Sequence, residues 1–220
     1  MEIPGKQSPI PDVPIIWVAS YPKSGNTWVR FLIFSLIFDC IDPDRVNDVI
    51  PDLNGFYMGN TENIDALGGF ERPWLIKTHF CFLESLPGFH NTVGSIYIVR
   101  NPIDVLFLNL NYQLILQAEQ MNLSVYEVED FSQEYIHNFL EQGGDTRWMA
   151  HGFGTWSQNY LSWVEGLDNF PRLVVRYEDL ILQPVTELRR LADYLDIATT
   201  SESLEETLRR CSFESMRAME

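Results

Sequence analysis

Apolar side chains gather in four short, nearly continuous runs along this 220-residue chain. The runs are Ile15–Ser20, Trp74–His79, Ser95–Arg100 and Arg172–Tyr177. Runs of this length without polar alternation predict strands that are covered on both faces of a sheet.

Longer segments with helical spacing of apolar residues lie between and after these runs. The first is apolar nearly all round, which predicts a buried helix, and a proline opens two of the others. The predicted helices are Thr27–Phe38, Ile103–Gln117, Phe153–Gly166 and Val185–Leu195. Because strands alternate with helices, the pattern predicts one α/β domain over residues 1–220, with a parallel sheet flanked by helices. Residues 1–14 are expected to be a proline-rich lead-in to it.

Composition narrows the classes of function. The net charge of −16 disfavours nucleic-acid binding, which needs a basic surface. The longest apolar stretch, Val29–Phe38, is too short to cross a membrane, and the N-terminus lacks the apolar region of a secretory signal. Three widely spaced cysteines, Cys40, Cys81 and Cys211, argue against a disulfide framework or a zinc site. We therefore expect an acidic cytoplasmic protein without a metal or a membrane partner.

The segment "SYPKSGNTW", Ser20–Trp28, joins the first predicted strand to the first predicted helix. Free N–H groups at a helix N-terminus, a glycine that allows close approach and a nearby lysine together make an anion-binding site. Lys23, Ser24, Gly25, Asn26 and Thr27 supply these groups. The alternative is an ordinary strand–helix turn capped by threonine. The segment does not match the Walker A pattern, in which the lysine follows the second glycine.

Several strings resemble the cytosolic-type sulfotransferases, which use 3′-phosphoadenosine 5′-phosphosulfate (PAPS) and release 3′-phosphoadenosine 5′-phosphate (PAP). "YPKSGNTW" is similar to the 5′-phosphosulfate loop of that family, and "IYIVRNPIDV" is similar to its 3′-phosphate segment. "IKTHFCFLESLP", "VRYEDL" and "CSFESMRAME" resemble further family segments in the same order. The strings most resemble bacterial members that modify natural products. The resemblance implies a P-loop-like sulfotransferase fold and sulfuryl transfer from PAPS to a hydroxyl or amine of a small molecule.

The resemblance also assigns roles at the reacting group. It implies that Lys23 stabilises the leaving group, that His79 is the general base, and that Lys77 is a second cation at the sulfuryl group. Residues two apart in a strand face the same way, so Lys77 and His79 are expected to share a face. Histidine titrates near neutral pH, which suits proton abstraction. A solvated surface lysine is the alternative for Lys23. The other histidines, at positions 90, 137 and 151, are interpreted as structural.

The remaining implied roles concern the nucleotide. Arg100 would hold the 3′-phosphate, because the guanidinium group matches phosphate oxygens in pairs. The alternative is a structural ion pair between Arg100 and Asp104. Trp28 would stack on adenine and Tyr177 would contact the adenosine, with packing in the core as the alternative for each aromatic.

The chain departs from the family at two places. A serine is expected eight residues after the 3′-phosphate arginine, but Leu108 stands there, and the neighbouring Asn109 is a possible substitute. The basic glycine-rich segment expected after Cys211–Glu220 is also absent. A truncated chain, relaxed cofactor selectivity and an inactive PAPS-binding relative are the three explanations considered.

Two acidic segments are not explained by cofactor chemistry. Asp39–Glu71 holds eight acidic residues and one basic residue, and Gln117–Asp145 holds seven acidic residues and no lysine or arginine. Together they carry a net charge of −14, of the −16 of the whole chain. Both are expected to be rich in loops and to frame the acceptor pocket, which would favour a cationic or neutral acceptor. The alternative is solvated surface.

A nucleotide-kinase-like phosphotransferase is the rival enzyme class, but it would want a Walker lysine and a magnesium carboxylate, and we find no such pair.

Overall fold

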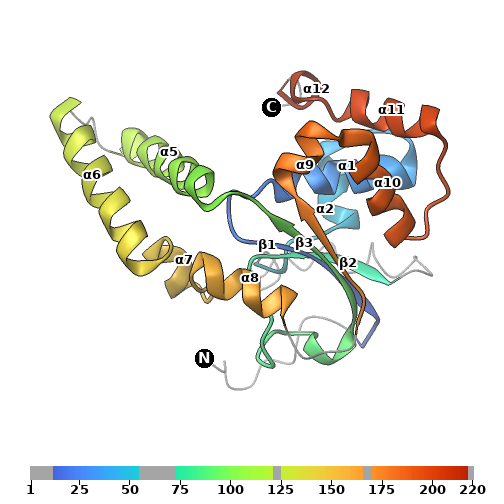
Figure 1. The fold of residues 1–220 in the computed structure, drawn as a ribbon, viewed down its shortest axis with the longest axis horizontal. Coiled ribbons are helices and arrows are strands. Elements are labelled where there is room, and N and C mark those ends of the chain that lie inside the picture. Colours follow the sequence, from blue (N-terminus) through green and yellow to red (C-terminus); the bar gives the residue numbers. More distant parts are fainter. Residues whose placement is uncertain (1–11, 55–72, 121–124, 166–169, 218–220) are drawn as a thin grey trace.

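The computed structural model describes residues 12–54, 73–120, 125–165 and 170–217. Its centre is a four-stranded parallel sheet in the order β2-β1-β3-β4 (Figure 1). The strands are β1 (Ile15–Ser20), β2 (Trp74–Thr78), β3 (Thr92–Val99) and β4 (Arg172–Arg176). All four predicted strands are present, and every pairing is parallel, as predicted.

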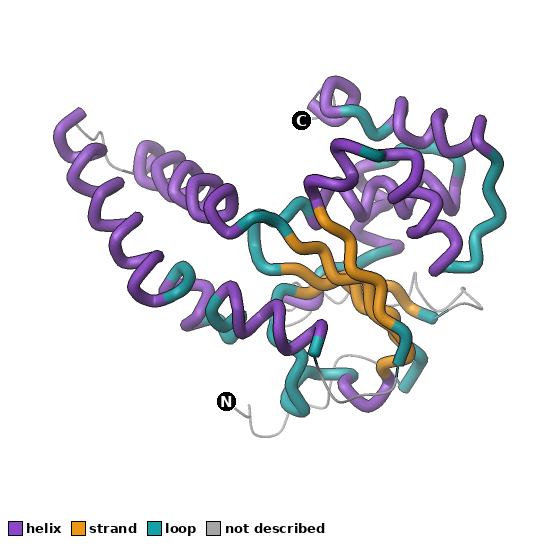
Figure 2. Tube along the Cα trace, viewed as in Figure 1, coloured by secondary structure: helices purple, strands orange, loops and turns teal. Residues whose placement is uncertain are grey.

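Helices cover both faces of the sheet, as Figure 2 shows by colour. The helices before β3 are α1 (Asn26–Phe38), α2 (Pro43–Val49) and the short 3₁₀ helix η1 (Phe89–Asn91). Those between β3 and β4 are α5 (Pro102–Gln120), α6 (Val125–Gln142), α7 (Thr146–Ala150) and α8 (Trp156–Val164). Those after β4 are α9 (Tyr177–Leu182), α10 (Pro184–Tyr194), α11 (Ser201–Arg210) and α12 (Phe213–Arg217).

Two hydrophobic cores lie on opposite faces of the sheet. On one face, Val18 and Ile96 pack with apolar residues of α1, α10 and α11. On the other face, Trp17 packs against Trp163 of α8, with ring centroids 6.3 Å apart. Alternate residues of β1 therefore enter different cores, which explains why the strand is apolar on both sides.

The structure differs from the prediction at the second and third predicted helices and at an acidic segment. The predicted helix Phe153–Gly166 begins later, at Trp156, because Gly154 has a φ of +69° and Thr155 forms a capping box with Gln158. Helix α5 extends to Gln120, three residues beyond the predicted end. The segment Gln117–Asp145 is not rich in loops, since α6 occupies most of it.

Candidate active site

Each of the four parallel strands ends in a segment that was singled out from the sequence. The loop Ser20–Trp28 follows β1, His79 follows β2, Arg100 follows β3 and Tyr177 follows β4. Since the strands are parallel, these segments meet at one edge of the sheet. There they surround a cavity of about 780 Å³. Of the site residues expected from the sequence, all line this cavity except Ser24.

The loop after β1 presents an open helix N-terminus. Gly25 is the N-cap of α1, with a φ of +96°, and among the described residues no side chain caps this helix end. Lys23 is also left-handed, with a φ of +68°. The buried hydroxyl of Ser24 has no hydrogen-bond partner in the described part of the chain. Unpaired donors at a helix N-terminus fit a bound anion.

The amide of Asn26 holds the loop to the end of β1. Its Nδ2 donates to the carbonyl oxygen of Val18 (3.1 Å) and to the hydroxyl of Ser20 (3.2 Å). These bonds occupy the side-chain donors of Asn26, which also lines the cavity. Thr27 is exposed at the same helix end.

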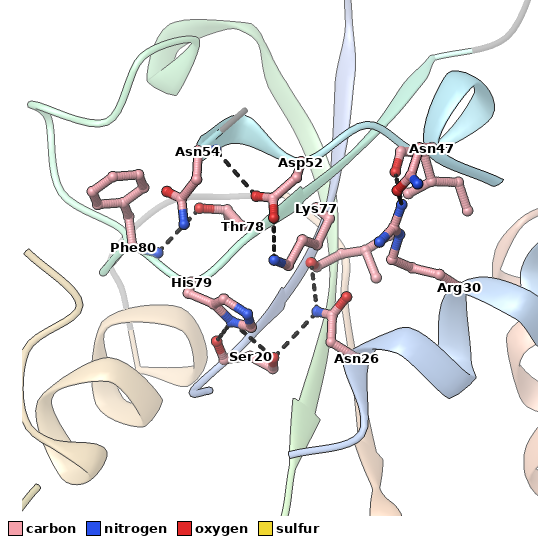
Figure 3. Close-up of polar contacts among 12 residues, drawn as sticks. Ser20, Asn26, Arg30, Asn47, Asp52, Asn54, Lys77, Thr78, His79 and Phe80 are labelled. Carbon is pink, nitrogen blue, oxygen red and sulfur yellow. Dashed lines mark hydrogen bonds and ion pairs between the residues drawn. The ribbon is translucent and has the colours of Figure 1, made fainter. Parts of the chain in front are cut away.

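His79 is fixed in one tautomer by the loop. Its Nδ1 lies 2.7 Å from the carbonyl oxygen of Ser20, which can only accept, so Nδ1 carries the proton and Nε2 has the free lone pair (Figure 3). The carbonyl oxygen of His79 accepts from Asn159 Nδ2 (2.8 Å), which anchors the backbone. Burial and then the charge of Lys77 lower the pKa of His79 below its usual range. A neutral imidazole with a free nitrogen can act as a general base.

Lys77 lies beside His79 and is paired with Asp52. Its Nζ donates to Asp52 Oδ2, and Asp52 Oδ1 accepts from the backbone N–H of Asn54 at 3.0 Å (Figure 3). Arg30 is a buried third cation, whose Nη2 donates to Asn47 Oδ1 (2.7 Å) and to the carbonyl of Ile50 (2.6 Å). Burial lowers the pKa of Lys77, and Asp52 opposes this effect. The sequence analysis missed Asp52, since only a parallel bridge from outside the strands brings it to Lys77.

A row of aromatic side chains connects the two candidate catalytic groups. The Nζ of Lys23 lies 3.7 Å from the ring centroid of Tyr112, and Tyr112 stacks on Trp148 with centroids 6.4 Å apart. Phe153 follows at 5.8 Å from Trp148, and His79 lies 5.7 Å from Phe153. We call Tyr112, Trp148 and Phe153 the aromatic wall. Burial lowers the pKa of Lys23.

Arg100 stacks on Tyr177 at the other side of the cavity. Its guanidinium carbon lies 3.9 Å from the centroid of the Tyr177 ring. The ion pair with Asp104, the alternative considered from the sequence, has an Nε–Oδ2 distance of 3.8 Å, which is too long for a hydrogen bond. The outer guanidinium nitrogens of Arg100 have no hydrogen bond to a described residue.

Trp28 lies between two other rings that face the cavity. It packs edge-on against Tyr177 (5.7 Å) and in a tilted arrangement against Phe213 of α12 (5.2 Å). Its Nε1 donates to the carbonyl of Cys211 at 2.9 Å. Phe213, Met216 and Arg217 also line the cavity and were missed as site residues. The aromatic and basic character of "CSFESMRAME" was the available signal.

Other residues considered from the sequence lie elsewhere. Leu108 is half-buried on α5 and does not line the cavity, and the amide of Asn109 is bonded to Val105 and Trp148. The remaining histidines do not line it either. In the described part of the chain, no aspartate or glutamate lines the cavity and no cluster of residues suits a metal ion. No described helix has the length and apolar character needed to cross a membrane.

Part of the acidic sequence lies outside this lining. Glu134 and Asp145 line a second cavity, of about 260 Å³, between α5, α6 and α7. Of Asp39–Glu71, residues 55–71 lie outside the described residues, as does Lys6.

A parallel sheet with an open helix N-terminus after its first strand, a nearby lysine and an arginine at a second strand end defines a P-loop-like anion-binding protein. The sulfotransferase domain family matches residues 14–220, so the chain belongs to this family.

Known relatives agree with that assignment. Mouse sulfotransferase 1B1 is 28% identical over 210 residues, which is 92% of this chain and 65% of that protein. Human sulfotransferase 6B1 is 25% identical over 205 residues, which is 92% of this chain and 62% of that protein. The chain thus spans slightly less than two thirds of these relatives.

Solved structures show the same fold. Mouse sulfotransferase SULT7A1, complexed with PAP, gives a TM-score of 0.65 at 24% identity, covering 95% of this chain and 67% of that one. Retinol dehydratase, in complex with androsterone and inactive cofactor PAP, gives a TM-score of 0.56 at 18% identity, covering 96% and 67%. The predicted P-loop-like sulfotransferase fold is confirmed.

Proposed function

We propose that this chain transfers a sulfuryl group from PAPS to a hydroxyl or amine of a small-molecule acceptor. The observation that carries the proposal is the convergence of an uncapped helix N-terminus, Lys23 and Arg100 in one cavity with neutral His79. The membership of the chain in the sulfotransferase family supports it.

The residues present fit such a nucleotide. Ser24 has a buried hydroxyl without a partner in the described chain, and the N–H groups of residues 25–28 suit the 5′ side. Arg100 has free outer donors for a 3′-phosphate. Trp28, Tyr177 and Phe213 offer aromatic surface to the adenosine. PAPS, when bound, supplies the activated sulfuryl group.

The chain's own residues supply the acid–base and electrostatic chemistry. His79 Nε2 takes the proton from the attacking oxygen or nitrogen of the acceptor, while its Nδ1–H stays bonded to Ser20. Lys23 stabilises negative charge on the leaving side, because it belongs to the loop before α1 and lines the same cavity as the helix N-terminus. Lys77, oriented by Asp52, adds a second positive charge beside His79. The aromatic wall provides an apolar surface between these groups.

Calorimetry with PAP, ADP and ATP tests the cofactor class without knowledge of the acceptor. We expect PAP to bind more tightly than ADP and ATP, because ADP and ATP lack the 3′-phosphate that Arg100 is proposed to hold. The lack of carboxylates in the described cavity lining disfavours a magnesium-dependent kinase. Preferential binding of ATP with magnesium would overturn the proposal. Binding of PAP with no turnover on any acceptor would instead favour a non-catalytic relative, which the leucine at position 108 also suggests.

The acceptor is proposed to be a natural product, cationic or neutral, in the cytoplasm. All three cysteines are free thiols, which supports a reducing compartment. The net charge of −16 would repel anionic acceptors at long range. A screen of amines, phenols and carboxylates at low and high salt tests the charge preference. A salt-insensitive preference for carboxylates would contradict it.

A further inference from the structure

Tyr177 lies between two groups that face the nucleotide side of the cavity. It is the first residue of α9, directly after β4, and its side chain is half-buried. One contact of its ring is with the Arg100 guanidinium, 3.9 Å from the ring centroid. Another is with Gly25, where an added Cβ would lie only 2.5 Å from Tyr177 Cδ2. A single ring thus contacts both the loop after β1 and the arginine after β3.

Arg100 has few other restraints in the described part of the chain. Its Nε is buried without a hydrogen bond, and the Asp104 carboxylate stands 3.8 Å away with a half-exposed side chain. A guanidinium group that stacks face-on keeps its edge donors free for a planar or tetrahedral anion. The ring of Tyr177 is therefore the contact that fixes the plane of Arg100 and the direction of its donors.

The residue after Tyr177 holds the residue after Arg100. Glu178 Oε1 accepts from the backbone N–H of Asn101 at 2.8 Å. Two consecutive residues at the start of α9 thus hold two consecutive residues at the end of β3, one pair through side-chain stacking and the other through a hydrogen bond. This double contact explains why the arginine is oriented although it has no close ion pair.

The contact with Gly25 places the same ring against the loop after β1. Gly25 has a φ of +96°, which favours glycine, and the absence of a Cβ lets Tyr177 approach the loop backbone. Gly25 meets the Cδ2 and Cε2 atoms of the ring and Arg100 lies over the ring, so one side chain limits how both the loop and Arg100 are placed. A nucleotide with phosphates on both its 5′ and 3′ positions needs both placements to be fixed, whereas a nucleotide with only a 5′-phosphate does not.

We propose that Tyr177 is a positioning residue that aims Arg100, and thereby sets the preference of the site for nucleotides with a 3′-phosphate. The inference rests on the proposed function. It goes beyond the adenosine contact expected from the sequence, because a contact with adenosine would act equally on nucleotides with and without the 3′-phosphate.

The ratio of the dissociation constants of AMP and PAP, measured by calorimetry, separates these roles. In Tyr177→Leu we expect this ratio to fall by roughly 2- to 30-fold, the range of a cation–π contact between exposed and desolvated sites. Tyr177→Phe keeps the ring and should keep the ratio of the unmodified chain. Phe213→Leu is the matched control, because Phe213 lines the cavity without a ring contact to Tyr177 among the described residues; it should weaken the binding of both nucleotides and leave the ratio unchanged. Tyr177→Met is the second variant, for use if the leucine variant does not fold.

A double-mutant cycle completes the test. If Tyr177 acts through Arg100, the double variant Arg100→Ala with Tyr177→Leu should have the same ratio as Arg100→Ala alone. An unchanged ratio in both Tyr177→Leu and Tyr177→Met overturns the inference while the proposed function stands. If the unmodified chain shows no preference for PAP over AMP, the proposed cofactor fails and this inference fails with it.

Discussion

At the scale of single residues, the two candidate catalytic groups are held by different physical means. The imidazole of His79 is fixed by a hydrogen bond to a carbonyl group, which determines its tautomer. The ammonium group of Lys23 rests on the Tyr112 ring, and no described carboxylate pairs with it. A base with a fixed lone pair and a cation without a counter-ion are both ready to interact with a ligand.

Replacing these two residues should separate catalysis from binding. We expect His79→Ala to lower turnover by about 10²–10⁴-fold, the usual effect of losing a positioned base. Its PAP affinity should stay close to that of the unmodified chain, because Nε2 serves the acceptor. Lys23→Ala should lower both turnover and PAP affinity. The measurements are steady-state kinetics and calorimetry.

The control for this pair is His137→Ala, since His137 is exposed on α6 and does not line the cavity. This control should keep full turnover. Near-normal turnover in His79→Ala would remove His79 from the mechanism.

The charge of Lys77 should be visible in the pH dependence of the reaction. Burial and then Lys77 lower the pKa of His79, so the base stays unprotonated below the usual histidine range, and activity should be lost only at low pH. Lys77→Gln removes a lowering influence and leaves Asp52 unopposed, and both changes raise the pKa of His79. The acid limb of kcat/KM should therefore move to higher pH in this variant.

A shift of that limb distinguishes an electrostatic role of Lys77 from a purely structural one, which would lower the rate at every pH. If the acid limb of Lys77→Gln coincides with that of the unmodified chain, the charge of Lys77 does not act on His79.

At the scale of elements, helix α8 holds the backbone of the segments that carry His79 and Phe153. Its Asn159 is fully buried, and its Nδ2 donates to the carbonyl oxygens of His79 (2.8 Å) and Phe153 (2.9 Å). Its Oδ1 accepts from the hydroxyl of Tyr97 at 2.8 Å. One amide thus joins α8 to β3 and to the segment after β2.

Asn159→Leu should lower the free energy of unfolding by about 2–4 kcal/mol, because buried carbonyl and hydroxyl groups lose their partners. Urea denaturation measures this change. Ser157→Ala, at an exposed position of the same helix, should have a much smaller effect. Equal stability of the two variants would show that buried water replaces the amide.

Strands were predictable because their apolar runs are short and compact, and the cavity followed because parallel strands bring their ends together. Helix α6 was missed because its acidic residues outweighed its apolar face, although Phe131, Tyr135 and Phe139 recur at four-residue intervals and pack together. Asp52 and Tyr112 could not be predicted, since one reaches the site through a bridge and the other from the third turn of α5.

At the scale of the whole molecule, positive charge is concentrated in the lining of the candidate active site. The charged residues among the described cavity lining are lysines and arginines, on a protein with a net charge of −16. This arrangement favours a polyanionic ligand inside the cavity of an otherwise acidic protein.

Because the chain has few lysines, amine-reactive reagents can label the cavity selectively. The chain has three lysines, and the two that are described, Lys23 and Lys77, both line the cavity. Amine-acylating reagents react only with the neutral amine, so the lowered pKa of Lys23 should make Lys23 reactive. The ion pair between Lys77 and Asp52 should slow the acylation of Lys77. Peptide mapping by mass spectrometry should find Lys23 acylated before Lys77, and PAP should protect Lys23. Acylation of Lys23 at an unchanged rate in saturating PAP would contradict its place beside the nucleotide. A nonspecific reagent would then act on this protein as an active-site label, because its surface offers so few competing amines.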